Sequence, residues 1–228
     1  MKSGGMTRVP RPVCSLPILG PIYSRIRAGL STIKHPPYAE AVSRRVIRSG
    51  DAVRYAAVGM ALSRLDQEGI EGAMAECGVW QGRLSSFLHS TAPVRRLYVF
   101  DTFSGFPEQN LEAKDRRFTD TSIELVKQNL GDLTNVELRP GYFPETTAGL
   151  EHERFAFVML DMDLYKSTID GLEFFHPRMV PGGYIFLHDF NNPLEPGVRK
   201  AVAEFFPDKP ERIIELPDYG GCAVVRKC

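Results

Sequence analysis

The stretch FAFVMLDMDLYKST, residues 155–168, joins six apolar residues directly to two aspartates. Residues 155–160 are typical of a strand buried in a parallel sheet. An ionised carboxylate is costly in such surroundings unless another group compensates its charge. Two interpretations follow. Either Asp161 merely ends the strand and Asp163 caps the next helix, or the strand opens onto a site where the carboxylates hold a ligand.

Working outward from this stretch, strands and helices alternate along most of the chain. Such alternation predicts right-handed crossovers and a parallel sheet with helices on both faces. Residues 211–227 read instead as two strands joined by a short turn, which permits only antiparallel pairing. We therefore expect an α/β fold with a seven-stranded, mostly parallel sheet and one antiparallel strand. The five other expected strands are 72–79, 96–101, 135–141, 155–161 and 182–189, and the expected helices are 38–48, 51–68, 82–90, 120–130, 167–177 and 197–206.

Length and composition limit the classes of function. A chain of 228 residues suits one α/β domain, which we place at 37–228 with its first helices at 38–68, after an irregular, basic, Pro-rich arm at 1–36. Lys plus Arg and Asp plus Glu both number 28, so no net charge draws the chain to nucleic acid or an anionic membrane. No apolar run approaches the ~20 residues of a membrane span. The four cysteines lack metal-ligand spacing, and we expect a reduced, cytoplasmic protein.

A glycine turn and an acidic residue indicate a nucleoside ligand. Gly78 and Gly82 follow the first strand of the alternating region, where glycine allows close backbone approach to a ligand. The G-x-G-x-x-G pattern is incomplete, so a plain strand-to-helix turn is the alternative. Asp101 follows Gly78 by 23 residues, at the position where a carboxylate binds ribose. Glu76 before the turn disfavours a pyrophosphate and favours S-adenosylmethionine, which carries a sulfonium.

Carboxylates also follow two further strands. Asp161 and Asp189 lie 28 residues apart, one helix crossover, so we expect them at adjacent strand ends. Converging carboxylates repel each other unless a proton or a cation intervenes. Such oxygen ligands suit Mg²⁺ or Ca²⁺, whereas without metal one carboxylate can serve as a general base. The alternative is that Asp189 only caps the following loop.

Five segments together resemble the macrocin and novobiocin O-methyltransferase family: ECGVWQG (76–82), LYVFDTFSGFPE (97–108), RPGYFPET (139–146), LDMDLYKST (160–168) and PGGYIFLHDF (181–190). The resemblance covers roughly residues 51–205. It implies a Rossmann-like class I methyltransferase fold, S-adenosylmethionine and a divalent metal, usually Mg²⁺. It also implies methylation of a hydroxyl on a sugar or phenolic ring of a small-molecule acceptor, such as a natural product or glycan.

The resemblance assigns roles to individual residues. Asp161 and Asp189 would be metal ligands, and Asp161 would also take the hydroxyl proton. Asp101 would hold the ribose. The other implied cofactor residues are Glu76, Gly78 and Gly82 on the methionine side, Thr102, Phe103 and Ser104 around the adenosine, and Gly141, Tyr142 and Phe143 by the adenine.

One departure affects the implied metal site. The family often has two adjacent acids after the fifth strand, whereas here Phe190 follows Asp189 and cannot bind metal. We expect Asn191 as the third ligand, with Asn192 or His188 as alternatives. His188 is also a candidate proton-handling catalytic residue, or simply a hydrogen-bonded histidine at a strand end.

Two other classes of function stay open at this point. One is a nucleotide-dependent oxidoreductase, which the incomplete glycine pattern disfavours. The other is a cofactor-binding protein without catalysis, which the altered metal ligands permit. The arm at 1–36 is a candidate contact with a partner subunit, which would make the protein a homo-oligomer.

Overall fold

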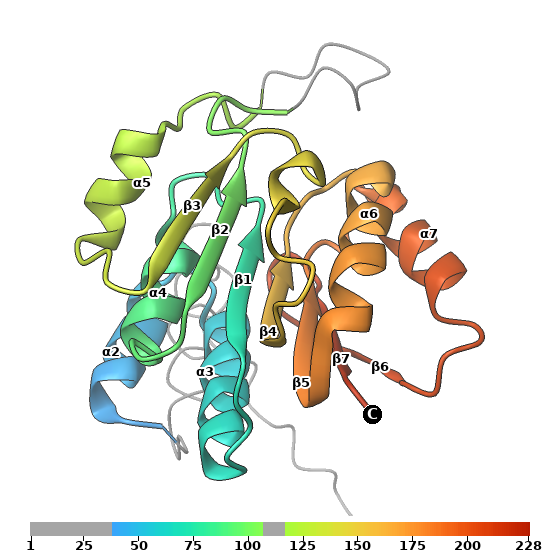
Figure 1. Cartoon of the computed structure of the whole chain (residues 1–228), viewed down its shortest axis with the longest axis horizontal. Coiled ribbons are helices and arrows are strands. Elements are labelled where there is room, and N and C mark those ends of the chain that lie inside the picture. The colour runs from blue at the N-terminus through green and yellow to red at the C-terminus, as the bar shows by residue number, and fades with distance from the viewer. Residues whose placement is uncertain (1–37, 107–116) are drawn as a thin grey trace, which may run out of the picture.

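The structure is a computed structural model of the chain and describes residues 38–106 and 117–228. A central sheet has helices on both of its faces (Figure 1). The arm predicted at residues 1–36 lies outside the described residues. No helix in 38–106 or 117–228 is long and apolar enough to cross a membrane.

The sheet has seven strands in the order β3-β2-β1-β4-β5-β7-β6. The first five strands pair in parallel, and β7 runs antiparallel to both β5 and β6. The predicted fold class, including its single antiparallel strand, is confirmed. The strand bounds are β1 Ala73–Cys77, β2 Leu97–Asp101, β3 Val136–Pro140, β4 Phe155–Leu160, β5 Met179–Leu187, β6 Ile213–Glu215 and β7 Ala223–Arg226.

Helices divide between the two faces of the sheet, and each face has its own apolar cluster. Side chains of α2 to α5 pack on one face, and those of α6 and α7 on the other. The bounds are α2 Glu40–Arg48, α3 Ala52–Gln67, α4 Arg83–Thr91, α5 Ile123–Leu130, α6 Tyr165–Phe175 and α7 Pro196–Phe205, with short 3₁₀ helices η2 Glu145–Thr147 and η3 His176–Arg178.

Alternation along the central strands decides which residues face which helices. All five residues of β1 are buried, and successive side chains point to opposite faces. Met74 joins the cluster under α3 and α4, whereas Ala75 joins the cluster under α6. Glu76, two residues after Met74, therefore faces α4. This is why a carboxylate can lie inside the sheet and still find a hydroxyl partner on that helix, Ser85.

Two helices begin differently from what the sequence suggested. Helix α5 does not begin at Asp120 as expected: it begins at Ile123 and is capped by Ser122, which accepts a hydrogen bond from the Leu125 amide at 3.1 Å. The Asp120 carboxylate accepts hydrogen bonds from the Trp80 indole and the Gln81 amide instead. Helix α6 has Leu164 at its N-cap without a side-chain cap, so Asp163 does not have the capping role considered for it.

Candidate active site

A cavity of about 440 Å³ opens at the carboxyl ends of the central strands, a size typical of small-molecule sites. Strand β1 connects outward to β2 and β3 on one side, and β4 and β5 lie on its other side. The boundary between β1 and β4 is the switch point where ligands bind in open α/β sheets. Residues following β1, β2, β4 and β5 all line the cavity.

The glycine turn after β1 fits tightly against β4. Gly78 has φ +80°, a conformation that favours glycine. A Cβ at this position would lie only 1.7 Å from the carbonyl oxygen of Asp161. Because Gly78 has no side chain, the ends of β1 and β4 can come into contact here, and no side chain projects into the cavity from this position. Gly82, also predicted for the cofactor, lies outside the cavity lining, and a Cβ there would lie 2.9 Å from Val126.

Asp101 joins the turn after β1 to the turn after β2. Its Oδ2 accepts hydrogen bonds from the backbone amides of Val79, at 2.6 Å, and Trp80, at 3.1 Å. Its Oδ1 accepts the Phe103 amide at 2.7 Å. The Thr102 hydroxyl also lies 3.4 Å from Oδ1, but its single proton has a nearer acceptor in the Gly105 carbonyl. A carboxylate has about four acceptor positions, so one position remains for a hydroxyl group in the cavity. The carboxylate thus organises the floor of the cavity and can still bind a ligand.

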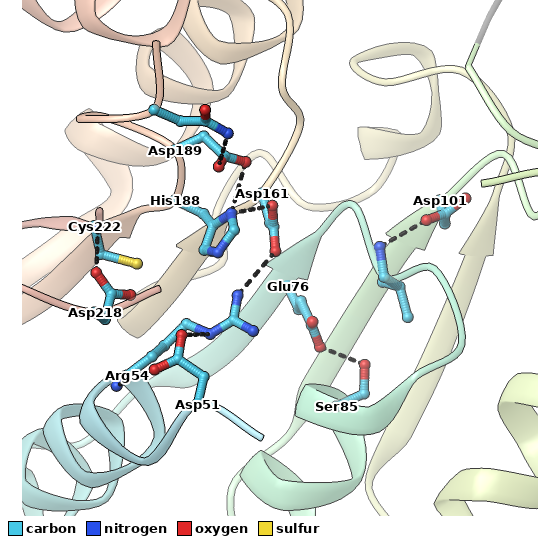
Figure 2. Close-up of polar contacts among 12 residues, drawn as sticks. Asp51, Arg54, Glu76, Ser85, Asp101, Asp161, His188, Asp189, Asp218 and Cys222 are labelled. Carbon is cyan, nitrogen blue, oxygen red and sulfur yellow. Dashed lines mark hydrogen bonds and ion pairs between the residues drawn. The ribbon is translucent and has the colours of Figure 1, made fainter. Parts of the chain in front are cut away.

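Glu76 is a buried carboxyl group on the wall of the cavity. Only 2% of its surface is exposed, and the Ser85 hydroxyl donates a hydrogen bond to it (Figure 2). Burial raises the pKa of Glu76 to about 8, and the hydrogen bond from Ser85 opposes this shift. The side chain is therefore mostly neutral at pH 7 in the free protein. A positively charged ligand group beside it would favour its ionised form.

Not every predicted cofactor residue lines the cavity. Phe103 is buried in the apolar cluster under α3 and α4, and the Ser104 amide donates to the Thr102 hydroxyl. Gly82, Phe103 and Ser104 thus support the turns without facing the cavity. The predicted residues that line it are Glu76, Gly78, Asp101, Thr102, Gly141, Tyr142 and Phe143.

Asp161, His188 and Asp189 form a compact group on the other side of the cavity. Strands β4 and β5 are neighbours, as predicted, and bring the two carboxylates together. The Nδ1 atom of His188 lies 2.8 Å from Asp161 Oδ1 and 2.7 Å from Asp189 Oδ2 (Figure 2). One ligand atom from each residue lies within 4.8 Å of the other two. We call these three residues the acid–histidine group.

Charges within this group shift its pKa values. Burial alone would lower the pKa of His188, but Asp161 and Asp189 raise it to about 10. Burial and the charge of Asp161 raise the pKa of Asp163 to about 9, so Asp163 is protonated at pH 7 and is hydrogen-bonded to Asp189. Protons on His188 and Asp163 thus offset the charge of the remaining carboxylates. These protons compensate the negative charge of the carboxylates at the end of buried strand β4.

Asn191, the predicted third metal ligand, is not brought into the acid–histidine group. Its amide nitrogen donates to Glu215 at 2.8 Å, and its oxygen accepts from Arg199. The Asn192 amide does reach the group, donating to Asp189 Oδ1 at 2.8 Å. The ligand set that the acid–histidine group itself offers is therefore two carboxylates and an imidazole.

Sequence reasoning missed several residues around this group. Arg54, from α3, lies 3.4 Å from Asp161 Oδ2 although 107 residues separate them, and no local pattern indicates that contact. The turn between β6 and β7 was recognised only as a turn, yet its Asp218 and Cys222 lie beside His188 (Figure 2). Tyr219 of the same turn lines the cavity and is 87% exposed.

Two curated relatives share sequence with this chain. It is 32% identical over 192 residues to 8-demethyl-8-(2,3-dimethoxy-alpha-L-rhamnosyl)-tetracenomycin-C 4'-O-methyltransferase of Streptomyces olivaceus, a match covering 72% of this chain and 73% of that protein. It is 29% identical over 160 residues to mycinamicin III 3''-O-methyltransferase of Micromonospora griseorubida, covering 61% of this chain and 62% of the relative.

One solved structure and one family model match this chain as well. The O-methyltransferase NovP superposes with a TM-score of 0.66 at 21% identity, over 90% of this chain and 97% of NovP, which supports the class I methyltransferase fold. The model of the macrocin-O-methyltransferase (TylF) family matches residues 50–215. This confirms the resemblance seen in the sequence and removes the oxidoreductase and the non-catalytic protein as alternatives. The chain belongs to the macrocin O-methyltransferase family of S-adenosylmethionine-dependent enzymes.

Proposed function

We propose that this O-methyltransferase transfers the methyl group of S-adenosylmethionine to a hydroxyl on the sugar of a natural product. The observation that carries the proposal is the position of the acid–histidine group in the same cavity as the turns around Asp101. One side of the cavity suits a nucleoside with a positive charge, and the other suits an alcohol that must lose a proton. Holding both reactants in one geometry lowers the barrier of a two-substrate reaction.

The residues on the cofactor side have the right chemistry for S-adenosylmethionine. Asp101 would accept hydrogen bonds from the ribose hydroxyls, and Glu76 would lie toward the positively charged methionine portion. Gly141, Tyr142 and Phe143 would line the adenine end. When bound, the cofactor supplies an electrophilic methyl group on sulfur.

Methyl transfer must also move one proton. In the transfer, the acceptor oxygen would gain the methyl carbon as the carbon–sulfur bond breaks, and the electron pair of that bond would stay on sulfur. The hydroxyl proton then needs an acceptor. Because the pKa of His188 is raised to about 10, its ring already holds a proton near pH 7 when no metal is bound. Asp161 is therefore the proposed base, and His188 orients it.

A divalent cation fits the acid–histidine group. Two carboxylates and one imidazole are a common ligand set, and the imidazole shifts the preference from Mg²⁺ toward Mn²⁺, Fe²⁺ or Zn²⁺. His188 thus replaces Asn191 as the proposed third ligand. Such a cation would stabilise negative charge developing on the acceptor oxygen. Asp161, His188 and Asp189 would bind it, and the Asn192 amide would orient Asp189.

The sugar acceptor is proposed from the relatives and from the cavity wall. The name of the Streptomyces olivaceus relative specifies a rhamnosyl compound and its 4'-O position. In this chain, aromatic side chains line the cavity, including Trp80, Phe118 and Tyr219. Aromatic faces can pack against the apolar C–H face of a sugar or against a ring system that carries it.

A methyl-transfer assay tests this proposal. Purified protein with isotopically labelled S-adenosylmethionine is offered glycosides, free sugars and phenols, and each product is analysed for a new O-methyl group. Methylation of a sugar hydroxyl is the expected result. Transfer confined to phenols would reject the sugar acceptor while leaving the methyltransferase class intact.

The metal is tested separately. The enzyme is assayed after treatment with excess EDTA and again after Mg²⁺, Mn²⁺ or Zn²⁺ is added back. We expect activity to fall and to return with a divalent cation. Full activity in EDTA would remove the metal from the proposal and leave Asp161 as a metal-free base.

We also propose that the chain assembles as a homo-oligomer through the arm at residues 1–36. The support is composition: the arm is rich in Pro and Arg and precedes the first described helix. Light scattering on the full chain and on a chain starting at residue 37 tests it. Equal association states in the two samples would count against the arm.

A further inference from the structure

Arg54 reaches the acid–histidine group from outside the strands that form it. It is the third residue of α3, and its guanidinium lies between two carboxylates (Figure 2). Nε lies 3.5 Å from Asp51 Oδ2, and an η nitrogen lies 3.4 Å from Asp161 Oδ2. Only 18% of the Arg54 side chain is exposed. An ion pair this sheltered from water is less screened than one on the surface.

The location of Arg54 is unfavourable by local rules. The first turn of a helix is the positive end of its dipole, where acidic residues are favoured and basic ones are not. Burial of a guanidinium adds a desolvation cost. Asp51 and Asp161 compensate both costs. Positions that break a local rule and are compensated elsewhere are frequent at functional sites.

The two oxygens of Asp161 have different partners. Oδ1 faces His188 at 2.8 Å, and Oδ2 faces Arg54 at 3.4 Å. Rotation of the carboxylate would break both contacts. Asp51 in turn holds Arg54, because Asp51 Oδ1 accepts the Arg54 amide at 3.2 Å while its Oδ2 faces the guanidinium. A chain of contacts thus runs from the start of α3 to the end of β4.

We propose that Arg54 is a positioning residue for methyl transfer, fixing the orientation of Asp161 through Oδ2. The inference rests on the proposed function, in which Asp161 takes the hydroxyl proton or binds the cation. Because the guanidinium stays charged at all relevant pH values, the positive charge beside Asp161 does not depend on pH. This role also makes the start of α3 part of the active site.

The experiment compares Arg54→Gln, which removes the charge, with Arg54→Lys, which keeps a charge but loses the planar fork. Arg64→Gln is the matched control, since Arg64 is on the same helix and pairs with Glu68 at 3.8 Å in an exposed ion pair. For each variant we measure kcat, KM for the acceptor, calorimetric Kd for S-adenosylmethionine, and Tm. The double variant Arg54→Gln/Asp161→Asn completes a cycle.

We expect Arg54→Gln to lower kcat about tenfold or more with little change in the Kd for S-adenosylmethionine. Arg54→Lys should recover part of the lost kcat. Arg64→Gln should have the kcat and Kd of the wild type. Because Asp161→Asn alone is expected to abolish methyl transfer, the double variant is compared by Tm: the stability effect of Arg54→Gln should shrink there, since the ion pair with the Asp161 carboxylate is already lost. Wild-type kcat in Arg54→Gln would overturn the inference. If that variant does not fold, Arg54→Lys decides: lowered kcat at wild-type Tm supports the role, and unchanged kcat rejects it.

Failure of the proposed function gives a different result. If Asp161→Asn alone is fully active, the assignment of Asp161 is wrong, whatever Arg54 does. If Asp161→Asn is inactive while Arg54→Gln is fully active, only the positioning role fails.

Discussion

The backbone of Gly78 is in direct contact with the backbone of Asp161, so that a Cβ on the glycine would lie 1.7 Å from the aspartate carbonyl oxygen. The two strands are also joined at this point by a hydrogen bond from the Asp161 amide to the Cys77 carbonyl at 2.8 Å. Gly78 belongs to the cofactor side of the cavity and Asp161 to the acid–histidine group. The contact therefore sets the spacing between the two halves of the active site.

Gly78→Ala should destabilise the protein strongly, because backbone atoms cannot move aside as a flexible side chain can. Gly69→Ala is the matched control: its φ is also positive, +64°, but no atom lies within 4 Å of the added Cβ. The control should cost about 1–2 kcal/mol for its left-handed backbone alone. Gly78→Ala should cost at least about 3 kcal/mol in urea unfolding. Equal losses in the two variants would contradict the contact.

Asp101→Ala should weaken S-adenosylmethionine binding by about tenfold or more, since it removes a charged hydrogen-bond acceptor and also releases the Val79 and Phe103 amides. Calorimetry measures the affinity. Circular dichroism shows whether the fold is retained, which we expect. Unchanged affinity would mean that the ribose lies elsewhere.

Asp161→Asn and Asp163→Asn should have different effects. Asp163 is protonated at pH 7 because its pKa is raised to about 9, and an amide closely resembles a protonated carboxyl group. Asp163→Asn should therefore fold and keep most of its activity. Asp161→Asn should abolish methyl transfer while cofactor affinity changes little. Initial rates and calorimetry on both variants check this, and an inactive Asp163→Asn with an active Asp161→Asn would reverse the assignment.

Gly220→Ala should displace the His188 ring. A Cβ at Gly220 would lie 2.3 Å from Nε2 of His188 and 2.5 Å from Cε1. We expect a loss of both stability and activity in the single variant. In a His188→Ala background the added methyl has room, so the same change should then cost little stability. Thermal unfolding of the four proteins in this cycle measures the coupling, and additive effects would show that the turn does not position the ring.

Glu211 should contribute to acid stability. Burial alone would raise its pKa, but Lys227, whose ammonium donates to Glu211 Oε1 at 2.5 Å, lowers the pKa from 4.5 to about 2. A carboxyl group with a lowered pKa stabilises the fold above its unfolded pKa and loses that contribution as pH falls through the folded value. Glu211→Gln should therefore flatten the fall in unfolding free energy between pH 4.5 and 2. Glu71→Gln, an exposed control, should leave that fall unchanged.

The sequence alone determined the sheet, its antiparallel strand and the family. Apolar runs, alternation and turn residues are local signals, and β–α alternation restricts the topology to few arrangements. It also determined that Asp161 and Asp189 would meet, because carboxyl ends of neighbouring parallel strands lie at one edge. The cap of α5 was not determined by local sequence: several polar residues precede the helix, and packing selected Ser122 while the Trp80 indole bound Asp120.

Only the tertiary structure decided the partners of the carboxylates. His188 and Asn191 are three residues apart, and nothing local indicates that the imidazole turns inward while the amide turns toward Glu215 and Arg199. Arg54 reaches Asp161 across 107 residues of chain, a contact that exists because α3 packs beside the end of β4. Short-range sequence patterns report local conformation, whereas these contacts and the resulting charges depend on how elements distant in sequence pack together.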